Sequence, residues 1–373
     1  MHILIPALHR PSKPTGVCRH AANLAQCLVD HDSVSNVTLI IGCWQKDYFD
    51  SSFSLVSPKI KLFEVDIKNS SVSRNWWFMF GLPKLVWELE PDIIHMSFPF
   101  PFIRQWFKAP VLSTIHDFYP YESPENFGYP QVWFNQLFLG QCVHNSDGII
   151  CVSGCTLKAL QHHFPKARAS QRAEVIYNVV DIATIKAKEP QLLVDHTAWP
   201  FLLTVAQHRK NKNLDLLIHA YHRLLIDGQL QETMRLLIVG SQGPETENLT
   251  HLVKLLGVEE KVHFLSGLTD GELCWLYRNT ALFIIASATE GFCLPLVEAL
   301  SLSGSAVCSD IPIFREVGAS QCRYFALDEH ACENLGHAIV EELAIERKNE
   351  VAVDYRFSKE NIAQQLLSYY RLF

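Results

Sequence analysis

The chain has 373 residues, of which 48% are hydrophobic and 19% charged, and its formal net charge is -7. The length favours two domains, each large enough for a core of its own, and the composition is that of an ordinary globular protein. The negative balance argues against nucleic acid as the main partner, so the charge that binds an anionic substrate must be local.

The cysteines and the first residues bear on the compartment. Eleven cysteines are scattered without regular spacing, which argues against a disulfide framework and favours the reducing cytoplasm. Residues 1–6 read as a strand and lack the basic and long apolar regions of a signal peptide. No run reaches the roughly 18 apolar residues of a transmembrane helix. We therefore expect a cytoplasmic chain and leave open a peripheral contact with the cytoplasmic face of a membrane.

Strand and helix patterns alternate over the first 182 residues, which predicts a doubly wound, parallel α/β sheet. The strands are expected at 1–6, 37–42, 91–95, 111–115 and 147–153. A polar loop with Gly16 at its turn leads from the first strand into an amphipathic helix over residues 20–29. Ser153 is expected to cap a helix that begins near Thr156.

Residues 74–108 are unusually aromatic and include Arg74, Arg104 and Lys108. Aromatic rings and basic side chains suit lipid headgroups, so this segment could rest on a membrane or hold a lipid-linked acceptor. Burial in the core is the alternative, and it is the commoner fate of such residues.

The strand over residues 111–115 ends in His116 and Asp117. At the carboxyl end of a parallel strand both side chains are placed for polar contact with a substrate, and histidine titrates near neutrality. A structural hydrogen bond is the alternative for this pair.

Residues 182–200 are polar and bounded by proline, which predicts the connection between two domains. Strand patterns resume at 201–205, 235–239, 262–268, 281–287 and 306–309. The chain closes with a helix whose cap is Ser358 and whose apolar face carries Ile362, Leu366 and Tyr370.

A loop with three cations in four positions connects the strand at 201–205 to a helix that starts at Leu214. Such a cluster is ordinarily solvated. At a strand-to-helix turn near an anion site it would instead bind a diphosphate, with Arg209 holding two oxygens and Lys212 acting as a point charge.

The stretch 288–300 follows a buried strand and therefore lies at the edge where open α/β sheets bind ligands. Pro295 suits the first turn of a helix, so the amides of the three residues before it are expected to face out of the helix mouth and receive an anion. These residues are Phe292, Cys293 and Leu294.

Two carboxylates, Glu290 and Glu298, flank this mouth. Acids beside an anion site are understandable when the ligand also offers hydroxyl donors, which a carboxylate can accept from. A phosphorylated, polyhydroxylated molecule such as a nucleotide sugar fits this combination. The alternative is a plain strand, loop and helix in which Glu290 complements the helix dipole and Glu298 is solvated.

The segment Glu290-Gly-Phe-Cys-Leu-Pro-Leu-Val-Glu298 resembles the E-x7-E signature of retaining GT-B glycosyltransferases of family 4, also called glycosyl transferases group 1. Weaker motifs follow in the family's order along nearly the whole chain, at 15–17, 175–181, 212–214 and 306–316. The resemblance implies two Rossmann-like domains with parallel sheets facing across a cleft. The acceptor domain would be 1–182 with the C-terminal helix 358–373 crossing back to it, and the nucleotide-sugar domain would be 200–357.

The resemblance also implies roles for individual residues. Glu290 would hold the hydroxyls of the transferred sugar, and Glu298 those of the ribose. Arg209 and Lys212 would stabilise the leaving diphosphate, and His116 would lie beside the transferred sugar or the acceptor. The further contacts that it implies are Gly16, Asn178, Leu268, Gly291, Phe292, Cys293 and Leu294 on the donor, with Asp117 on the acceptor side.

The implied reaction moves a sugar from a nucleotide diphosphate to a hydroxyl acceptor with retained anomeric configuration. The acceptor expected is a saccharide or a lipid-linked precursor, as in polysaccharide or glycolipid assembly. No D-x-D motif of the metal-dependent kind is present, so the cations are expected to take the metal's place and neither metal nor cofactor is expected.

The chain departs from the family pattern at two places. Val179 replaces a usual glycine, and Gln207 or Asn211 stands where an arginine is usual. A catalytically silent GT-B binding or scaffold protein therefore stays an alternative. A sugar-nucleotide epimerase or hydrolase on the same fold is another, because fold alone does not fix the reaction.

Overall fold

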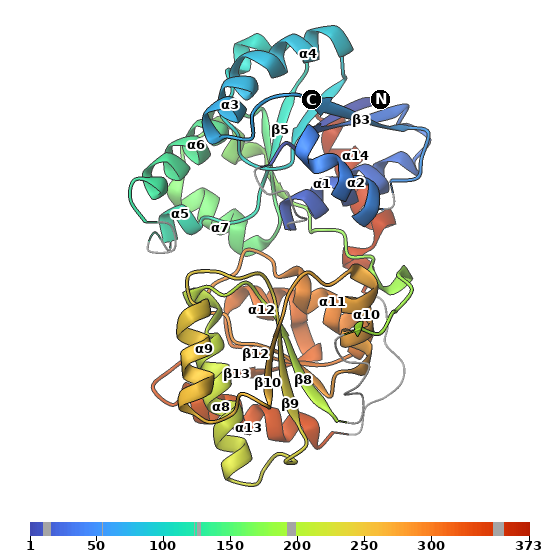
Figure 1. The fold of residues 1–373 in the computed structure, drawn as a ribbon. Coiled ribbons are helices and arrows are strands. Elements are labelled where there is room, and N and C mark those ends of the chain that lie inside the picture. Colours follow the sequence, from blue (N-terminus) through green and yellow to red (C-terminus); the bar gives the residue numbers. More distant parts are fainter. Residues whose placement is uncertain (10–15, 54, 123, 125–127, 192–198, 346–353) are drawn as a thin grey trace. The chain divides into compact units, whose positions relative to one another are not determined.

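The computed structural model describes residues 1–9, 16–53, 55–122, 124, 128–191, 199–345 and 354–373. Its chain forms two compact units (Figure 1). The first consists of Met1–Val179 and Tyr355–Phe373, and the second of Val180–Asp354. Each unit is an α/β body with a parallel sheet of its own.

The first unit is built on a seven-stranded parallel sheet in the order β3-β2-β1-β4-β5-β6-β7. Its strands are β1 (His2–Pro6), β2 (Asn36–Gly42), β3 (Ile60–Val65), β4 (Ile93–Met96), β5 (Val111–Ile115), β6 (Gly148–Cys151) and β7 (Ala173–Val175). The central strands are short runs of branched apolar residues, as expected when helices cover both faces of a sheet. The order reverses between β1 and β4, which makes the doubly wound prediction correct.

Helices connect these strands across both faces. They are α1 (Gly16–Val29), α2 (Lys46–Ser52), α3 (Ser71–Trp76), a π-helical turn η2 (Trp77–Gly81), α4 (Leu82–Leu89), α5 (Tyr119–Glu122), α6 (Gln131–Asn145), α7 (Gly154–His163) and α14 (Lys359–Tyr370). Ser153 caps α7, because its Oγ accepts a hydrogen bond from the Thr156 amide at 3.0 Å. That predicted cap is confirmed, and Ser358 caps α14 in the same way.

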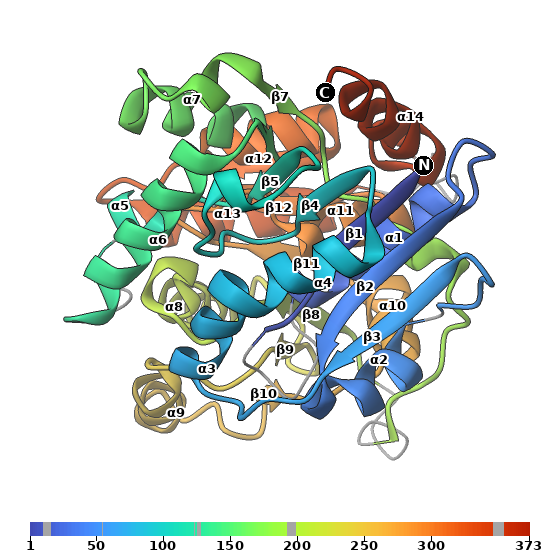
Figure 2. The ribbon, with the colours of Figure 1, turned by 90° about the horizontal axis from the view of Figure 1, so that it is seen from above.

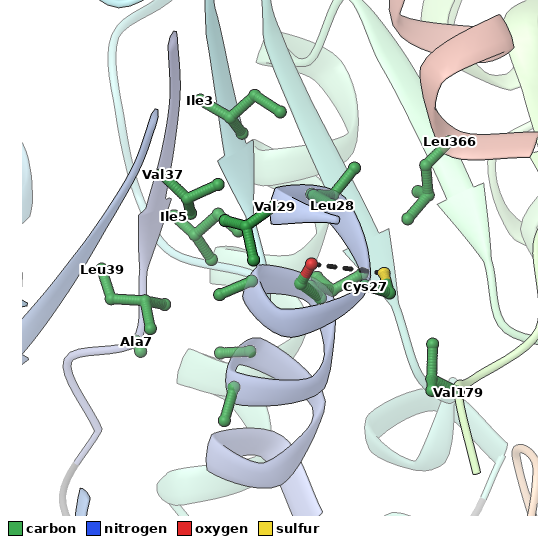
Figure 3. Packing of buried hydrophobic residues seen from close by; sticks show 14 of the residues in the cluster. Ile3, Ile5, Ala7, Cys27, Leu28, Val29, Val37, Leu39, Val179 and Leu366 are labelled. Carbon is green, nitrogen blue, oxygen red and sulfur yellow. Dashed lines mark hydrogen bonds between the residues drawn. The ribbon is translucent and has the colours of Figure 1, made fainter. Parts of the chain in front are cut away.

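The C-terminal helix belongs to the core of the first unit. α1 and α14 lie side by side (Figures 1 and 2). Figure 3 shows how Leu366 of α14 joins Leu28 of α1 and Ile3 of β1 in one apolar cluster. Tyr369 of α14 donates to the Ile149 carbonyl at 3.2 Å. The last turns of the chain are thus fixed to the sheet by both packing and hydrogen bonding.

The second unit has a six-stranded parallel sheet in the order β10-β9-β8-β11-β12-β13. Its strands are β8 (Phe201–Val205), β9 (Arg235–Val239), β10 (Val262–Leu265), β11 (Leu282–Ile285), β12 (Ala306–Ser309) and β13 (Cys322–Phe325). Its helices are α8 (Leu214–Ile226), α9 (Thr246–Leu255), α10 (Asp270–Asn279), α11 (Leu294–Ser303), α12 (Pro312–Gly318) and α13 (Ala331–Leu343). The strand order reverses between β8 and β11, which places a ligand-binding switch point there.

We expect Leu366→Ala to lower the free energy of unfolding by about 2–5 kcal/mol, because it leaves a cavity where α14 meets the sheet. Leu366 is fully buried, whereas Leu372 is 65% exposed. Leu372→Ala is therefore the matched control, with an expected change within about 0.5 kcal/mol. Chemical denaturation measures both, and equal losses would show that α14 does not pack as described.

Candidate functional site

Two loops at the carboxyl ends of β8 and β11 are tied together in the second unit. The Ala288 amide donates to the Asn211 carbonyl at 2.8 Å, and Asn211 Nδ2 donates to the Thr289 carbonyl at 3.3 Å. Asn213 Nδ2 donates to the Ala286 carbonyl at 2.9 Å. Asn213 has φ 48, a left-handed value that asparagine tolerates better than most residues. These bonds set the loop with the cation cluster against the loop with the first glutamate.

Lys212 and Glu290 meet at this junction. Lys212 Nζ lies 2.6 Å from Glu290 Oε1, and the two side chains are only 15% and 10% exposed. Ser287 Oγ also donates to Glu290 Oε1, at 2.8 Å. An ammonium group carries three donors, so Lys212 can hold Glu290 and still offer hydrogen bonds to another oxygen. The structure thus brings together two side chains that the sequence placed in separate motifs.

The other two cations of the cluster differ from Lys212. Lys210 lies 3.4 Å from Asp215 in an exposed pair. Arg209 is half-buried, and its guanidinium forms no ion pair or hydrogen bond with any other residue in the part of the chain that the structure describes. The Arg209 guanidinium, in the loop after β8, is therefore available to bind an anion from outside the described chain.

The helix α11 begins where the sequence predicts, at Leu294, with Pro295 in its first turn. Cys293 is the residue before it and has φ 72, a strained value for a side chain other than glycine. Burial, followed by the charge of Glu290, raises the pKa of the Cys293 thiol, so this residue stays protonated. Phe292 and Cys293 are both buried, and Gly291 precedes them in the same loop.

Glu298 lies inside the unit. It is 8% exposed, and Tyr277 of α10 donates its hydroxyl to Glu298 Oε2 at 3.0 Å. The alternative interpretation that Glu298 is solvated is therefore wrong. Tyr277 had no signal in the sequence beyond its place in a helical pattern, and only the packing of α10 against α11 makes it the partner of this carboxylate.

The glycine-rich turn after β9 contacts its own chain. A Cβ atom at Gly240 would lie 1.9 Å from the Ala206 carbonyl oxygen, and one at Gly243 would lie 2.4 Å from the His208 carbonyl oxygen. Both glycines thus let this turn pack on the loop after β8. Leu268, one of the expected donor contacts, is half-buried and follows Gly267, which has φ 73.

In the first unit, His116 follows β5 and sits among other histidines. Its Nε2 donates to the Ser97 carbonyl at 2.9 Å, because a carbonyl oxygen only accepts. Burial lowers the pKa of His116, so the ring is neutral near pH 7 and Nδ1 carries the lone pair. His20 of α1 packs edge-on against it with ring centroids 4.7 Å apart. No local pattern in the sequence indicated His20 as the neighbour of His116.

The remaining first-unit residues lie around this histidine. Asp117 Oδ1 accepts from the Tyr119 amide at 3.0 Å, so it fixes the start of α5. Asn178 is buried beside His20. Gly16 is exposed at the start of α1 and leaves open space, among the described residues, where a Cβ would stand. Thr15 of the same motif lies outside the described residues.

The described residues contain neither a metal-binding cluster nor a helix that could span a membrane. They contain no group of three or more histidine, cysteine, aspartate or glutamate side chains arranged to hold a metal ion. Among their helices none is long and apolar enough to cross a membrane.

Two Rossmann-like units, each with a switch point at the edge of a parallel sheet, define a protein of the GT-B class. The family model for Glycosyl transferases group 1 matches residues 188–356, and that for Glycosyltransferase Family 4 matches residues 14–184. Together they cover nearly the whole chain, which belongs to the GT-B glycosyltransferases of family 4.

The curated relatives are matched over part of their length. The O-antigen chain mannosyltransferase RfbU of Salmonella typhimurium strain LT2 is 27% identical over 249 residues, 65% of this chain and 65% of that protein. A diphospho-undecaprenol 4-alpha-N-acetylgalactosaminyltransferase of Campylobacter jejuni is 33% identical over 178 residues, 47% of this chain and 45% of that protein. The chain thus spans less than two thirds of the length of these relatives.

Solved structures agree with the fold over the whole chain. Anabaena HepE in complex with UDP and glucose has a TM-score of 0.71 at 17% identity, covering 100% of both chains. WaaG, a glycosyltransferase involved in lipopolysaccharide biosynthesis, has a TM-score of 0.67 at 15% identity, covering 100% of this chain and 98% of that one. The predicted GT-B fold is confirmed by this agreement.

Acid should destabilise the first unit through its buried histidines. Burial lowers the pKa of His95 to about 3, and its ring bonds Tyr370 at 2.5 Å and Thr114 at 2.7 Å. Because this folded pKa lies below the ordinary histidine value of 6.5, protons bind the unfolded chain preferentially, and stability is lost as the pH falls below about 6.5 toward 3.

The expected slope is about 1.4 kcal/mol per pH unit for each such histidine. The free energy of unfolding, measured from pH 7 to 4.5, should fall less steeply in His95→Gln than in the wild type. His31→Gln, at an exposed position, is the control and should keep the wild-type slope. An unchanged slope in His95→Gln would contradict the assignment.

Lys212→Ala should be strongly destabilising, because it leaves the nearly buried Glu290 carboxylate without its cation. Removing one partner of such a pair costs about 3–5 kcal/mol. Lys210→Ala removes an exposed pair whose side chains are 68% and 47% exposed, so its loss should stay below about 1 kcal/mol. Chemical denaturation compares them, and similar small losses would show that the Lys212–Glu290 pair is not formed in solution.

Proposed function

We propose that this chain is a retaining glycosyltransferase that moves a sugar from a nucleotide diphosphate to a hydroxyl group of a saccharide or lipid-linked acceptor. The observation that carries the proposal is the Lys212–Glu290 pair beside Cys293, at the start of α11 and at the switch point of the second unit, with Arg209 in the same loop as Lys212. Arg209 has no anionic partner in the described chain. A diphosphate supplies the anion that such a cation needs.

The chemistry follows from where charge develops. As the bond from the sugar to the diphosphate breaks, negative charge grows on the leaving phosphate. Arg209 and Lys212 neutralise that charge, and the first amides of α11, from Phe292 to Leu294, add donors with the favourable helix dipole. The leaving phosphate takes the acceptor's proton in a front-face reaction. The protein's cations do the work of a metal, so the reaction needs none.

The carboxylates supply the contacts with hydroxyl groups. Glu290 binds those of the transferred sugar, and its charge stabilises positive charge on the ring. Glu298 binds those of the ribose through the carboxylate that Tyr277 holds in place. Gly16, Leu268, Gly291 and Asn178 complete the donor contacts. In the first unit, neutral His116 offers Nδ1 as an acceptor for a hydroxyl proton, and Asp117 lies on the acceptor side.

The named relatives support the class of substrates. RfbU is an O-antigen chain mannosyltransferase, and the Campylobacter protein acts on a diphospho-undecaprenol acceptor by its name. HepE was solved with UDP and glucose. By analogy we place the chain in the assembly of a polysaccharide or glycolipid. We further propose a cytoplasmic site of action, in keeping with eleven free cysteines, and a peripheral contact with the membrane through residues 74–108.

A catalytically silent binding protein is the second candidate, because the chain departs from the family at Val179 and in the arginine position. The structure weakens the first reason. Val179 is buried and lacks a positive φ, and its carbonyl accepts a hydrogen bond from Asn23 at 3.1 Å. Glycine is therefore not needed at that turn. The second reason, the missing arginine, must be tested by experiment.

Calorimetric titration with UDP, GDP, dTDP and ADP, each in the presence of a chelator, tests the donor site. We expect one nucleotide to bind without metal. Arg209→Ala should weaken that binding about 10- to 100-fold, since a hydrogen bond to a charged group is worth about 1.5–3 kcal/mol. Lys210→Ala is the matched control and should bind like the wild type. If no nucleotide binds, the silent binding protein is favoured.

The nucleotide sugar that matches the bound base then serves for product analysis by NMR. A product with the donor's anomeric configuration supports retention, whereas free sugar alone or an epimerised donor indicates the hydrolase or epimerase.

A further inference from the structure

The aromatic segment of the first unit is only partly in the core. Phe78, Phe102 and Phe107 are buried there, as one alternative predicted. Trp76 and Trp87, by contrast, are 67% and 68% exposed. The exposed large apolar side chains of this segment and of Val72 just before it form what we call the aromatic face: Val72, Trp76, Phe80, Trp87 and Trp106. Burial of tryptophan is the norm, so a group of exposed ones marks a surface that meets something.

The aromatic face is continuous. It runs along α3, η2 and α4, which follow one another without a break from Ser71 to Leu89 (Figure 1). The ring centroids of Trp76 and Phe80 are 4.4 Å apart, and those of Phe80 and Trp106 are 5.6 Å apart. Val72, Trp76 and Phe80 are spaced four residues apart, so they form one stripe on the helical segment.

Two hollows open on this face. Trp76 and Phe80 line the first, together with Ile67, Val72 and Trp77. Trp87 and Trp106 line the second, together with Val86, Pro91 and Lys108. A side chain at Gly81 would lie 2.5 Å from Trp77 Cδ1, so glycine there makes room for the Trp77 ring at the edge of the first hollow. The hollows offer apolar surface between rings that project outward.

Charge and hydrogen bonding indicate what covers the face. Lys68 is the one charged residue that lines the first hollow. Lys108 Nζ lies 5.2 Å from the Trp87 ring centroid, although Glu90 also lines that second hollow. The indole N–H groups of Trp76, Trp87 and Trp106 donate no hydrogen bond to another residue in the described ranges.

Tryptophan with an unused N–H beside lysine is the combination that suits the headgroup layer of a bilayer. The ring enters the apolar boundary while the N–H and the ammonium meet ester and phosphate oxygens. A protein partner would need hydrogen-bond acceptors for the indole N–H groups and apolar side chains shaped to both hollows. Lipid tails are fluid and can fill hollows of any shape.

We propose that the aromatic face is the surface through which this chain docks on a phospholipid bilayer, with lipid tails in the two hollows and Lys68 on a headgroup phosphate. This inference names the surface for the membrane contact that is part of the proposed function and rests on that part alone. It requires neither nucleotide binding nor sugar transfer.

Flotation of the full chain with vesicles of phosphatidylcholine and phosphatidylglycerol tests the proposal. The wild type should float with the vesicles, and Trp76→Ser combined with Trp87→Ser should lower the partition at least about tenfold, because both rings lose their apolar burial. Trp133→Ser is the matched control: Trp133 is 64% exposed on α6 and lines neither hollow. It should bind as the wild type does.

Three outcomes would overturn the proposal. The first is that the wild type does not float with the vesicles. The second is that Trp133→Ser loses as much binding as the double variant. The third is that the aromatic face serves self-association. In the last case the double variant becomes monomeric by sedimentation while vesicle binding is absent in every form. Circular dichroism and melting of each variant show that it is folded.

Two further variants separate the parts of the argument. Arg209→Ala should float as the wild type does, so a failure of nucleotide binding leaves the membrane result readable, and the reverse also holds. Lys68→Ala should lose the extra binding that phosphatidylglycerol adds over pure phosphatidylcholine. If Lys68→Ala and the wild type bind equally to both kinds of vesicle, Lys68 is not part of the membrane-binding surface.

Discussion

Parallel pairing of every strand is the constraint on which the rest of this structure depends. Helices cover both faces of the central strands of each sheet, so most side chains of those strands are apolar and the groups free to meet a ligand lie at the strand ends. In the second unit the order reverses between β8 and β11. The loops that leave these two strands diverge to opposite faces, and the space between them is where a ligand can reach backbone and side chains together.

That space is lined by charged and polar groups whose burial costs free energy. Lys212 and Glu290 are both nearly enclosed, and Glu298 is enclosed with Tyr277 as its partner. Such pairs are poor stabilisers of a fold, because desolvation consumes most of their attraction. Cys293 adds a strained backbone at the same place. Apolar residues would stabilise the fold better at this place. Because buried charges and backbone strain both gather at one sheet edge, their presence is an argument for a ligand site.

The sequence was informative wherever one pattern had one physical meaning. Buried strands, the cap at Ser153 and the start of α11 at Leu294 follow from hydrophobic runs, a serine and a proline. Three short strands, β3, β7 and β13, were not predicted, since β3 alternates at the sheet edge, β7 has three residues and β13 has only one buried side chain. The partners of the functional side chains were also not predicted. His20 beside His116 and Tyr277 beside Glu298 depend on how helices pack, which no local pattern encodes.

The arginine position shows how the site tolerates a change in sequence. Asn211 uses its carbonyl and its side-chain amide to hold the loop after β11, through Ala288 and Thr289. Under the proposed function the cation that binds phosphate then comes from a neighbour, and Arg209 is the half-buried cation in this loop without an anionic partner in the described chain. Guanidinium reaches two oxygens at once, so a shift of two residues along the loop can conserve the interaction while its backbone origin changes.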